Sequence, residues 1–192
     1  GDMFSFVMEI EGIDFSESLK ILADRAGVEI EKIDKNRQNE RLRLLQLIDE
    51  SVKFYEAEMR KNGEVIAYLK KRGMKGETAK SFGIGYAPAG WRNLYDYLKD
   101  KGYSDSEMEK AGMTVKSAKA QAGYYDRFRS RIMFPILNAS GQAVGFSGRI
   151  FGEEGTDSGG KYINSPQTVL YDKSAILYAF DKAKNEIRKK DA

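Results

Sequence analysis

Three arginines at a spacing of two residues lie in a short segment that is also rich in aromatic side chains. They are Arg127, Arg129 and Arg131, and their aromatic neighbours are Tyr124, Tyr125 and Phe128. Residues two apart on a β-strand share a face, so the guanidinium groups would lie side by side if a strand begins this early. Guanidinium groups bind phosphates, and aromatic rings stack on bases. The pattern is typical of a surface for single-stranded nucleic acid, and equally of a charged strand edge that prevents aggregation.

Two further patterns bear on phosphate binding. Gly155 to Lys161 has the G-x-x-x-x-G-K spacing of a phosphate-binding loop, but Tyr162 follows where a Ser or Thr hydroxyl would reach magnesium. Pro166 also comes too soon for a helix N-terminus to receive the phosphates, so nucleotide hydrolysis is not predicted here. Arg149, Lys161 and Lys173 form a looser set of cations. Lys173 would lie in the first turn of an expected helix, where the helix dipole disfavours a positive charge.

Residue types that the chain lacks exclude several kinds of catalysis. The sequence contains no Cys and no His, which excludes disulfides, thiolate or imidazole zinc sites, and nucleophilic triads built on His. Two-metal phosphoryl transfer needs Asp and Glu clustered on rigid elements. The carboxylates after residue 120 are scattered, without an Asp-x-Asp pair: Asp126, Glu153, Glu154, Asp157, Asp172, Asp181, Glu186 and Asp191. We therefore expect no metal ion, no cofactor and no catalytic residue in this part of the protein.

Hydrophobic periodicity predicts the helices that must position these residues. Two short helices are expected within the first thirty residues, the second with a capping box from Asp14 to Glu17 and a stop at Gly27. A long amphipathic helix is expected over 41–60 and a shorter one around 65–69, followed by an irregular segment at 82–91 that is rich in Gly and Pro. Further helical patterns lie at 94–98 and 106–111.

The strand signal is concentrated at 129–151. Residues 132–136 and 143–146 flank a turn at 138–141 and predict a hairpin. A loop at 152–160 and a final helix over 173–190 follow. The order predicts an α+β fold: a helical N-terminal part, then a small, mostly antiparallel sheet and a C-terminal helix.

Length, composition and charge limit the class of protein. The 192 residues are 41% hydrophobic and 32% charged, as in soluble globular proteins, and no apolar run approaches the roughly 20 residues of a membrane helix. No membrane association and a cytoplasmic location are expected. The net charge of +3 conceals an acidic front, because residues 1–59 carry 14 acidic and 8 basic side chains. Such asymmetry is expected of a protein that binds a polyanion, and also of an ordinary solvated imbalance.

Long motifs give the chain a resemblance to a known family. The stretches YDRFRSRIMFPI, GFSGR, KYINSP and YDKS, preceded by YLKKRGM and FGIGYAPAGW, closely resemble the DnaG-type bacterial DNA primases, in the same order. The opening thirty residues also look like the family. The resemblance implies that 1–34 is the tail of a zinc-binding module with its linker, and that 35–192 is the N-terminal subdomain of the RNA polymerase core. Zinc ligands would precede Gly1, and a metal-binding TOPRIM subdomain would follow Ala192.

The resemblance also implies roles for individual residues. The basic positions that hold the template strand in the family correspond to Arg131, Arg149, Lys161 and Lys173, with Arg72 as a weaker candidate. Template or nucleotide support is implied for Asn164, Ser165 and Arg129, and Trp91 is a motif position that would hold loops and core together. The chain departs from the family pattern at Ser147, Gln167, Asp172, Ser174 and Ala179, which usually are Gly, Glu, His, Gly and Gly.

For the whole protein, the resemblance implies a DNA-directed RNA polymerase, a nucleotidyltransferase that makes RNA primers for replication with Mg or Mn and a structural Zn. Its implied partners are a single-stranded DNA template, the primer–template hybrid, ribonucleoside triphosphates, and a replicative helicase bound through parts outside this chain. The protein would be a monomer in the nucleoid, and this part alone would be inactive. Two alternatives stay open: a non-catalytic module for single-stranded nucleic acid, and a scaffold that binds partner proteins through 41–60.

Overall fold

The computed structural model describes residues 2–28, 35–118, 123–152 and 160–190. The chain divides into two compact units, residues 1–38 and 39–192, and each is considered by itself. Residues 155–159, most of the G-x-x-x-x-G-K pattern, lie outside the described residues.

The first unit contains two helices, α1 (Met3–Glu11) and α2 (Phe15–Ala26). Each begins at an Asp whose carboxylate accepts a backbone N–H, as Asp14 does from Glu17, and ends at a glycine of positive φ, which is 64° at Gly27. Helix capping by Asp and termination at a left-handed Gly are local effects, so both short helices could be predicted from the sequence, and this prediction is confirmed.

The described part of the second unit is built from six helices and six strands. The helices are α3 (Lys35–Lys61), α4 (Gly63–Lys71), α5 (Gly76–Ser81), α6 (Asn93–Asp100), α7 (Asp105–Lys110) and α8 (Phe180–Lys189). The strands are β1 (Gly85–Ala87), β2 (Thr114–Lys116), β3 (Tyr124–Asp126), β4 (Arg131–Leu137), β5 (Ala143–Ile150) and β6 (Tyr162–Asn164). Among these elements, no helix is long and apolar enough to span a membrane.

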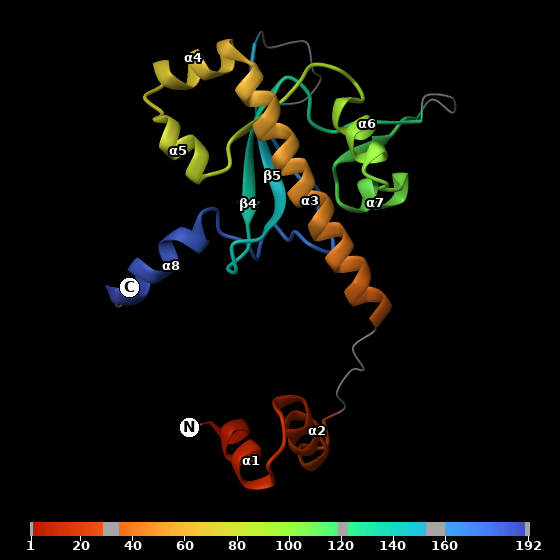
Figure 1. The fold of residues 1–192 in the computed structure, drawn as a ribbon, viewed down its shortest axis with the longest axis vertical. Coiled ribbons are helices and arrows are strands. Elements are labelled where there is room, and N and C mark those ends of the chain that lie inside the picture. Colours follow the sequence, from red (N-terminus) through yellow and green to blue (C-terminus); the bar gives the residue numbers. More distant parts are fainter. Residues whose placement is uncertain (1, 29–34, 119–122, 153–159, 191–192) are drawn as a thin grey trace. The chain divides into compact units, whose positions relative to one another are not determined.

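The strands form a four-stranded sheet of order β1-β4-β5-β6 and a separate β2–β3 pair, all antiparallel. The central hairpin turns where it was predicted, because Asn138 donates its N–H to the Gln142 carbonyl at 2.9 Å and Gly141 supplies a φ of 82°. Figure 1 shows α3 crossing this sheet, with α4 and α5 to one side and α6 and α7 to the other. The α+β fold and the antiparallel sheet are thus confirmed.

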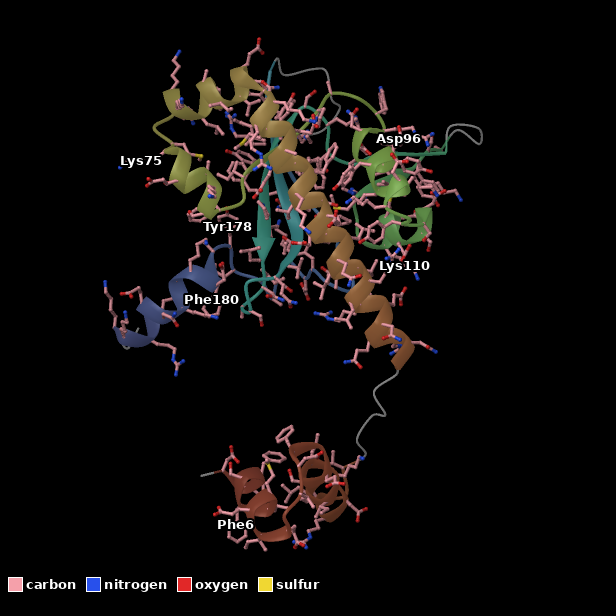
Figure 2. The ribbon with its side chains drawn as sticks, viewed as in Figure 1. Phe6, Lys75, Asp96, Lys110, Tyr178 and Phe180 are labelled. Carbon is pink, nitrogen blue, oxygen red and sulfur yellow. The ribbon has the colours of Figure 1, made fainter. Side chains whose placement is uncertain are left out.

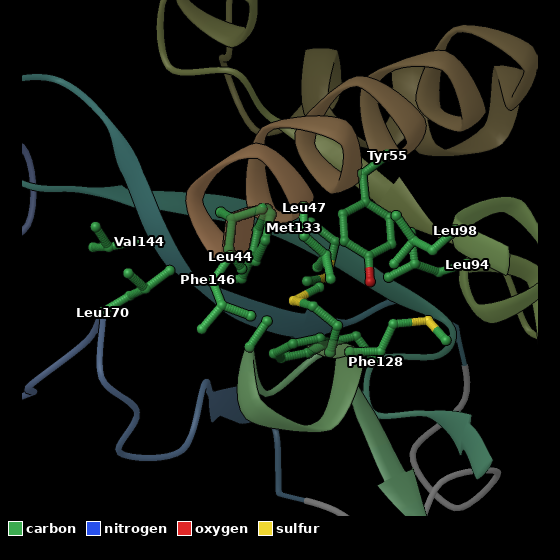
Figure 3. Close-up of a cluster of buried hydrophobic side chains, with 14 of the residues drawn as sticks. Leu44, Leu47, Tyr55, Leu94, Leu98, Phe128, Met133, Val144, Phe146 and Leu170 are labelled. Atoms are coloured by element: carbon green, nitrogen blue, oxygen red, sulfur yellow. The ribbon is translucent and has the colours of Figure 1, made fainter. Parts of the chain in front are cut away.

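One face of the sheet packs on α3 and forms the main core. Leu44, Leu47 and Tyr55 of α3 are buried against Met133 and Phe146 of the central strands, as Figure 3 shows. The ring of Tyr55 meets that of Phe146 edge-on, with 5.4 Å between centroids. The apolar period of 41–60 therefore predicted the helix. It did not predict the whole buried face, because Leu42 is 52% exposed while Leu44 and Leu47 are buried.

The opposite face of the sheet is covered only in part. Ile132 packs there with Val65 and Leu69 of α4 and with Ala79 of α5 in a second, smaller cluster. Beyond this cluster the face carries Phe134 of β4 beside Ser147 of β5 and Asn164 of β6, which matters for the site described next.

Several predicted boundaries are wrong. Strand β4 begins at Arg131, so Arg127 and Arg129 precede it and the period-two argument does not apply to them. The last helix begins at Phe180 rather than 173, so Lys173 is not in a first helical turn and the helix-dipole argument fails. Strand β1 lies inside the segment expected to be irregular, and α3 begins at Lys35 rather than at 41.

Candidate nucleic-acid interface

The register of the sheet separates the two motif arginines of the hairpin. Residues that lie opposite each other on antiparallel strands share a face, and Ile132, Arg149 and Tyr162 lie in one such row across β4, β5 and β6. Arg131, the neighbour of Ile132, therefore points to the other face, which α3 covers. Arg131 and Arg149, which the resemblance assigns together to the template strand, therefore lie on opposite faces of the sheet.

Arg131 is fully buried and binds backbone carbonyls. Its side chain is 0% exposed, and its Nη1 donates to the carbonyl oxygens of Gly148 at 3.2 Å and Gly160 at 3.1 Å. A Cβ at Gly148 would lie 3.1 Å from Cδ of Arg131, so the glycine of the GFSGR motif leaves room for this side chain. Arg131 thus connects β5 to Gly160, the residue before Lys161. The carbonyl of Lys161 in turn accepts the N–H of Ile150 at 3.0 Å.

Arg149 lies on the open face, among aromatic rings. Its guanidinium carbon is 5.3 Å from the centre of the Tyr68 ring of α4, and that ring contacts Phe151 at 5.5 Å between centroids. The Nη1 of Arg149 also donates to the Ile150 carbonyl at 3.3 Å. Cation–π contact orients a guanidinium without neutralising it, so the charge of Arg149 remains available to an anion.

A groove of about 580 Å³ continues this open face beyond Arg149. Ser147, Tyr162 and Asn164 line it from the sheet, and Lys173 lines it from the segment that leads into α8. Tyr162 is 58% exposed, and Lys161, which precedes it, is exposed as well. An ammonium group and an open aromatic ring in one groove suit the phosphates and bases of a single strand.

The apolar wall of the groove comes from α5 and the α8 approach. Tyr178, on the segment that leads into α8 in Figure 2, stacks on Phe82 with 6.4 Å between ring centroids and 21° between planes. Neither ring was singled out from the sequence. Their positions depend on the approach to α8 passing beside α5, which no local pattern reveals.

The turn around Lys173 is fixed by its two neighbours. The Asp172 carboxylate accepts the backbone N–H of Ser174 at 2.9 Å and its hydroxyl at 2.6 Å, and these bonds lower the pKa of Asp172. Both residues are departures from the family pattern. Together they form a small hydrogen-bonded turn that keeps the backbone of Lys173 at the groove.

The other predicted site residues have different surroundings. Arg72 is exposed at the C-cap of α4, four residues after Tyr68, which is one helical turn. Ser165 is 6% exposed and exchanges two hydrogen bonds with Phe146, with its Oγ accepting at 2.9 Å and its N–H donating at 2.8 Å. Ser165 therefore attaches the segment after β6 to β5, while Asn164 faces the groove.

Arg129 lies apart from the groove, against two rings. Its guanidinium carbon is 4.3 Å from the centre of the Trp91 ring and 5.3 Å from that of Tyr125. Trp91 is 64% exposed, so its side chain does not belong to the core, contrary to the structural role considered from the sequence.

A larger hollow of about 900 Å³ lies along α3 and the β4–β5 turn, but two of its three lysines are already paired. Lys53 contacts Asp49 and Glu50 at 2.8 Å each, and Lys101 contacts Glu50 at 3.2 Å. Hydrogen bonds from Lys53 and other neighbours lower the pKa of Glu50 to about 2. Lysines paired in this way gain less from a phosphate, so the smaller groove is the better candidate.

No three Asp or Glu side chains in the described part of the chain lie close enough to hold a metal ion. These residues therefore do not fit the catalytic metal that the resemblance implies for the whole protein, and no chemical step is assigned to them.

Residues 54–184 match the family described as DNA primase catalytic core, N-terminal domain. The DNA primase of Streptomyces coelicolor is 36% identical over 197 residues, covering 98% of this chain and 30% of that protein. This chain thus spans about a third of the length of the curated relatives it matches.

Solved structures agree with the sequence match. The RNA polymerase domain of Mycobacterium tuberculosis primase DnaG, in complex with a double-stranded DNA oligomer with a 6-nucleotide overhang, superposes with a TM-score of 0.69 at 35% identity, over 77% of this chain and 46% of that one. The Aquifex aeolicus primase structure, of zinc-binding and RNA polymerase domains, has a TM-score of 0.69 at 30% identity, over 99% of this chain and 45% of that one. Family motifs, fold and sequence identity coincide, and the chain belongs to the DnaG-type DNA primase family, in the N-terminal domain of its catalytic core.

Proposed function

We propose that this chain holds a single-stranded DNA template for a primase that polymerises ribonucleotides. In this proposal Arg149, Lys161 and Lys173 bind template phosphates, with Arg72 extending the basic surface along α4. Tyr162 and Asn164 contact bases or sugars from the groove between these cations. Arg131 and Ser165 act as positioning residues, because both are buried and bonded to backbone.

One observation supports this proposal above the others. Arg149 and the groove-lining Tyr162, Asn164 and Lys173 belong to the same open face of the sheet, and the exposed ring of Tyr162 lies in the row of Arg149. Alternating cations and an accessible ring are what a single strand requires, because phosphates attract the cations and bases stack on the ring. A scaffold that binds proteins through α3 would have no use for this arrangement.

Primer synthesis is proposed for the whole protein only. Joining nucleotides by phosphoryl transfer needs metal ions held by clustered carboxylates, and we infer that these, like a zinc site, belong to other parts of the protein. Residues 1–34 are proposed as the tail of a zinc-binding module and 35–192 as the subdomain of the polymerase core. Ribonucleoside triphosphates, the primer–template hybrid and a replicative helicase are the proposed further partners of a monomeric enzyme.

The template proposal is tested by the salt dependence of DNA binding. Binding of a labelled dT oligonucleotide is followed by fluorescence anisotropy between low and high salt for wild type, Arg149→Ala, Lys161→Ala and Lys173→Ala. Each variant is expected to bind more weakly and to reduce the slope of log K against log salt by about 0.7, the value for one phosphate contact on a single strand. Lys53→Ala is the matched control, because its ammonium is already paired. Unchanged slopes in all three variants would refute the assignment.

Arg131→Ala is expected to act on the fold instead. Removing the guanidinium leaves the carbonyls of Gly148 and Gly160 without their buried donor, which costs about 2–4 kcal/mol of stability. Urea denaturation measures this loss, and Lys161→Ala, at an exposed side chain, is expected to change stability by less than about 0.5 kcal/mol. Loss of DNA affinity by Arg131→Ala at full stability would mean instead that Arg131 touches the template.

A further inference from the structure

Trp91, Tyr125 and Arg129 form a surface cluster that the groove does not include, in which Trp91 is exposed and the other two side chains are half-buried. The Trp91 and Tyr125 rings meet edge-on, with 5.5 Å between centroids and 76° between planes. The Arg129 guanidinium lies 4.3 Å from the centre of the indole. Because Trp91 remains 64% exposed, most of the indole is open to a ligand. The indole is thus an accessible aromatic face that a neighbouring ring and a guanidinium hold in place.

The cluster is anchored from below by Asp126. The N–H of Asp126 donates to the Trp91 carbonyl at 2.7 Å, and its buried carboxylate accepts the N–H groups of Leu94 and Tyr95 at 2.8 and 2.9 Å, at the start of α6. Arg129 donates to the carbonyl of Asp126. The backbones beneath the indole and the guanidinium are thus held by one residue, so the cluster is preorganised and loses little entropy on binding.

The backbone also connects this cluster to the proposed template face. Ser130 donates its N–H to the Pro88 carbonyl at 3.2 Å and accepts the N–H of Phe151 at 2.8 Å. Ser130 is the neighbour of Arg129, and Phe151 follows Arg149 by two residues. Backbone hydrogen bonds therefore join the cluster to the end of the sheet where β5 ends, one residue after Arg149.

We propose that Trp91, with Tyr125 and Arg129, is a stacking platform for a base of the single-stranded template, next to the phosphate contacts of Arg149. The inference rests on the proposed function and extends it from phosphate binding to base binding. The ligand class is a nucleobase of any identity, because every base has a π-face and no hydrogen-bonding pattern is read. Arg129 holds the indole and adds a cation near the adjoining phosphate.

The chain provides its own probe, because Trp91 is its only tryptophan. Titration of wild type with a dT oligonucleotide is expected to quench the tryptophan fluorescence in parallel with the anisotropy change of labelled DNA. Trp91→Ala is expected to weaken dT binding about 5- to 100-fold, the range for loss of one stacked base, and Trp91→Phe to recover most of this loss. Arg129→Lys keeps the charge but not the planar contact, and is expected to weaken binding less than Arg129→Ala.

Two controls separate stacking from other effects. An abasic oligonucleotide of equal length keeps the phosphates and removes the bases, so wild type and Trp91→Ala should bind it equally and without quenching. Phe6→Ala, at another aromatic that is 64% exposed, should leave binding unchanged. Thermal unfolding of Trp91→Ala is expected to shift only slightly, because the indole is 64% exposed and the carbonyl of residue 91 still accepts the N–H of Asp126.

The possible outcomes distinguish this inference from the function on which it rests. In one outcome, wild type binds dT tightly and in a salt-dependent way, but without quenching and with no change in Trp91→Ala. That result would refute the stacking platform and leave the phosphate contacts supported. Equal weakening of dT and abasic binding by Trp91→Ala would also overturn stacking, since the indole would then serve the backbone. If wild type binds neither the dT nor the abasic oligonucleotide, both proposals are refuted.

Discussion

Ala179 has a left-handed backbone conformation, which glycine adopts more easily than alanine. Its φ is 60°, and a Cβ makes the left-handed region cost about 1–2 kcal/mol, whereas glycine enters it freely. The family motif that this segment resembles usually has glycine at this position. We expect Ala179→Gly to raise the free energy of unfolding by about 1 kcal/mol in urea denaturation. Ala183→Gly, inside α8, is the opposite control and should lower it by about 0.5–1 kcal/mol. Equal effects of the two changes would contradict the left-handed conformation.

Asp126 is a buried carboxyl group, and its burial disfavours the charged form. Desolvation raises its pKa to about 6, against the backbone N–H bonds from Leu94 and Tyr95, which favour the charged form. A folded-state pKa above the unfolded value means that the folded protein binds the proton more tightly. The stability due to this proton is therefore complete below about pH 4 and is lost as the pH rises through about 6.

The sign of this effect can be tested by comparison with Asp126→Asn, which does not titrate. The unfolding free energy of wild type, minus that of the variant, is expected to fall by about 2–3 kcal/mol between pH 4 and pH 7. The variant itself should be less stable at every pH, because an amide offers one acceptor oxygen to two N–H groups. A difference that rises with pH would show that the helix N–H groups, and not burial, dominate the pKa of Asp126.

At the scale of elements, the approach of β1 to α3 depends on a missing side chain. A Cβ at Gly85 would lie 2.5 Å from Cβ and 2.6 Å from the carbonyl carbon of Tyr55, and backbone atoms cannot move aside without displacing the helix. We expect Gly85→Ala to lower the free energy of unfolding by at least about 2 kcal/mol. Gly63→Ala, in the first turn of α4 with nothing within 4 Å of the added Cβ, should be neutral or stabilising by up to about 1 kcal/mol. Similar effects at both sites would show that β1 does not pack on α3 this closely.

The sequence predicted elements well where the signal was local and repeated. The helix over 41–60 repeats its apolar pattern over many turns, and the hairpin has its own turn residues, so both appear where expected. Strands β1, β2, β3 and β6 have three residues each, too few to show a period of two. They form because longer strands and helices beside them supply hydrogen-bond partners. Such partners are known only from the tertiary structure.

For the candidate site, too, local sequence patterns were informative and tertiary contacts could not be predicted. The motifs identified which cations to consider, but the faces they occupy depend on where β4 begins, and a shift of one residue reverses every side chain. Arg131 is therefore buried, while Arg149 is half-buried on the opposite face. Tyr68, which orients Arg149, comes from a distant helix, so no spacing in the sequence points to it.

At the scale of the whole molecule, charge is divided between the two compact units. Residues 1–38 carry nine acidic and five basic side chains, and residues 39–192 carry 20 acidic and 27 basic ones. The residues proposed to bind DNA all belong to the second unit, as do both apolar clusters of the sheet. Stability and DNA binding should therefore reside in residues 39–192, and the acidic unit should reduce the attraction of the whole chain for a polyanion.

Deletion of residues 1–38 tests this division. The remaining chain is expected to keep its thermal midpoint, and to bind a dT oligonucleotide several-fold more tightly at low salt, because a net negative charge has been removed. The gain should disappear near 0.5–1 M salt, where the screening length falls to about 3–4 Å, and the slope of log K against log salt should become steeper. Replacing the nine acidic residues of 1–38 by Asn and Gln within the full chain should reproduce the gain without shortening the protein. If the deletion lowers the midpoint or weakens binding at every salt concentration, the first unit contributes to the fold or to the template site, and the charge argument does not hold.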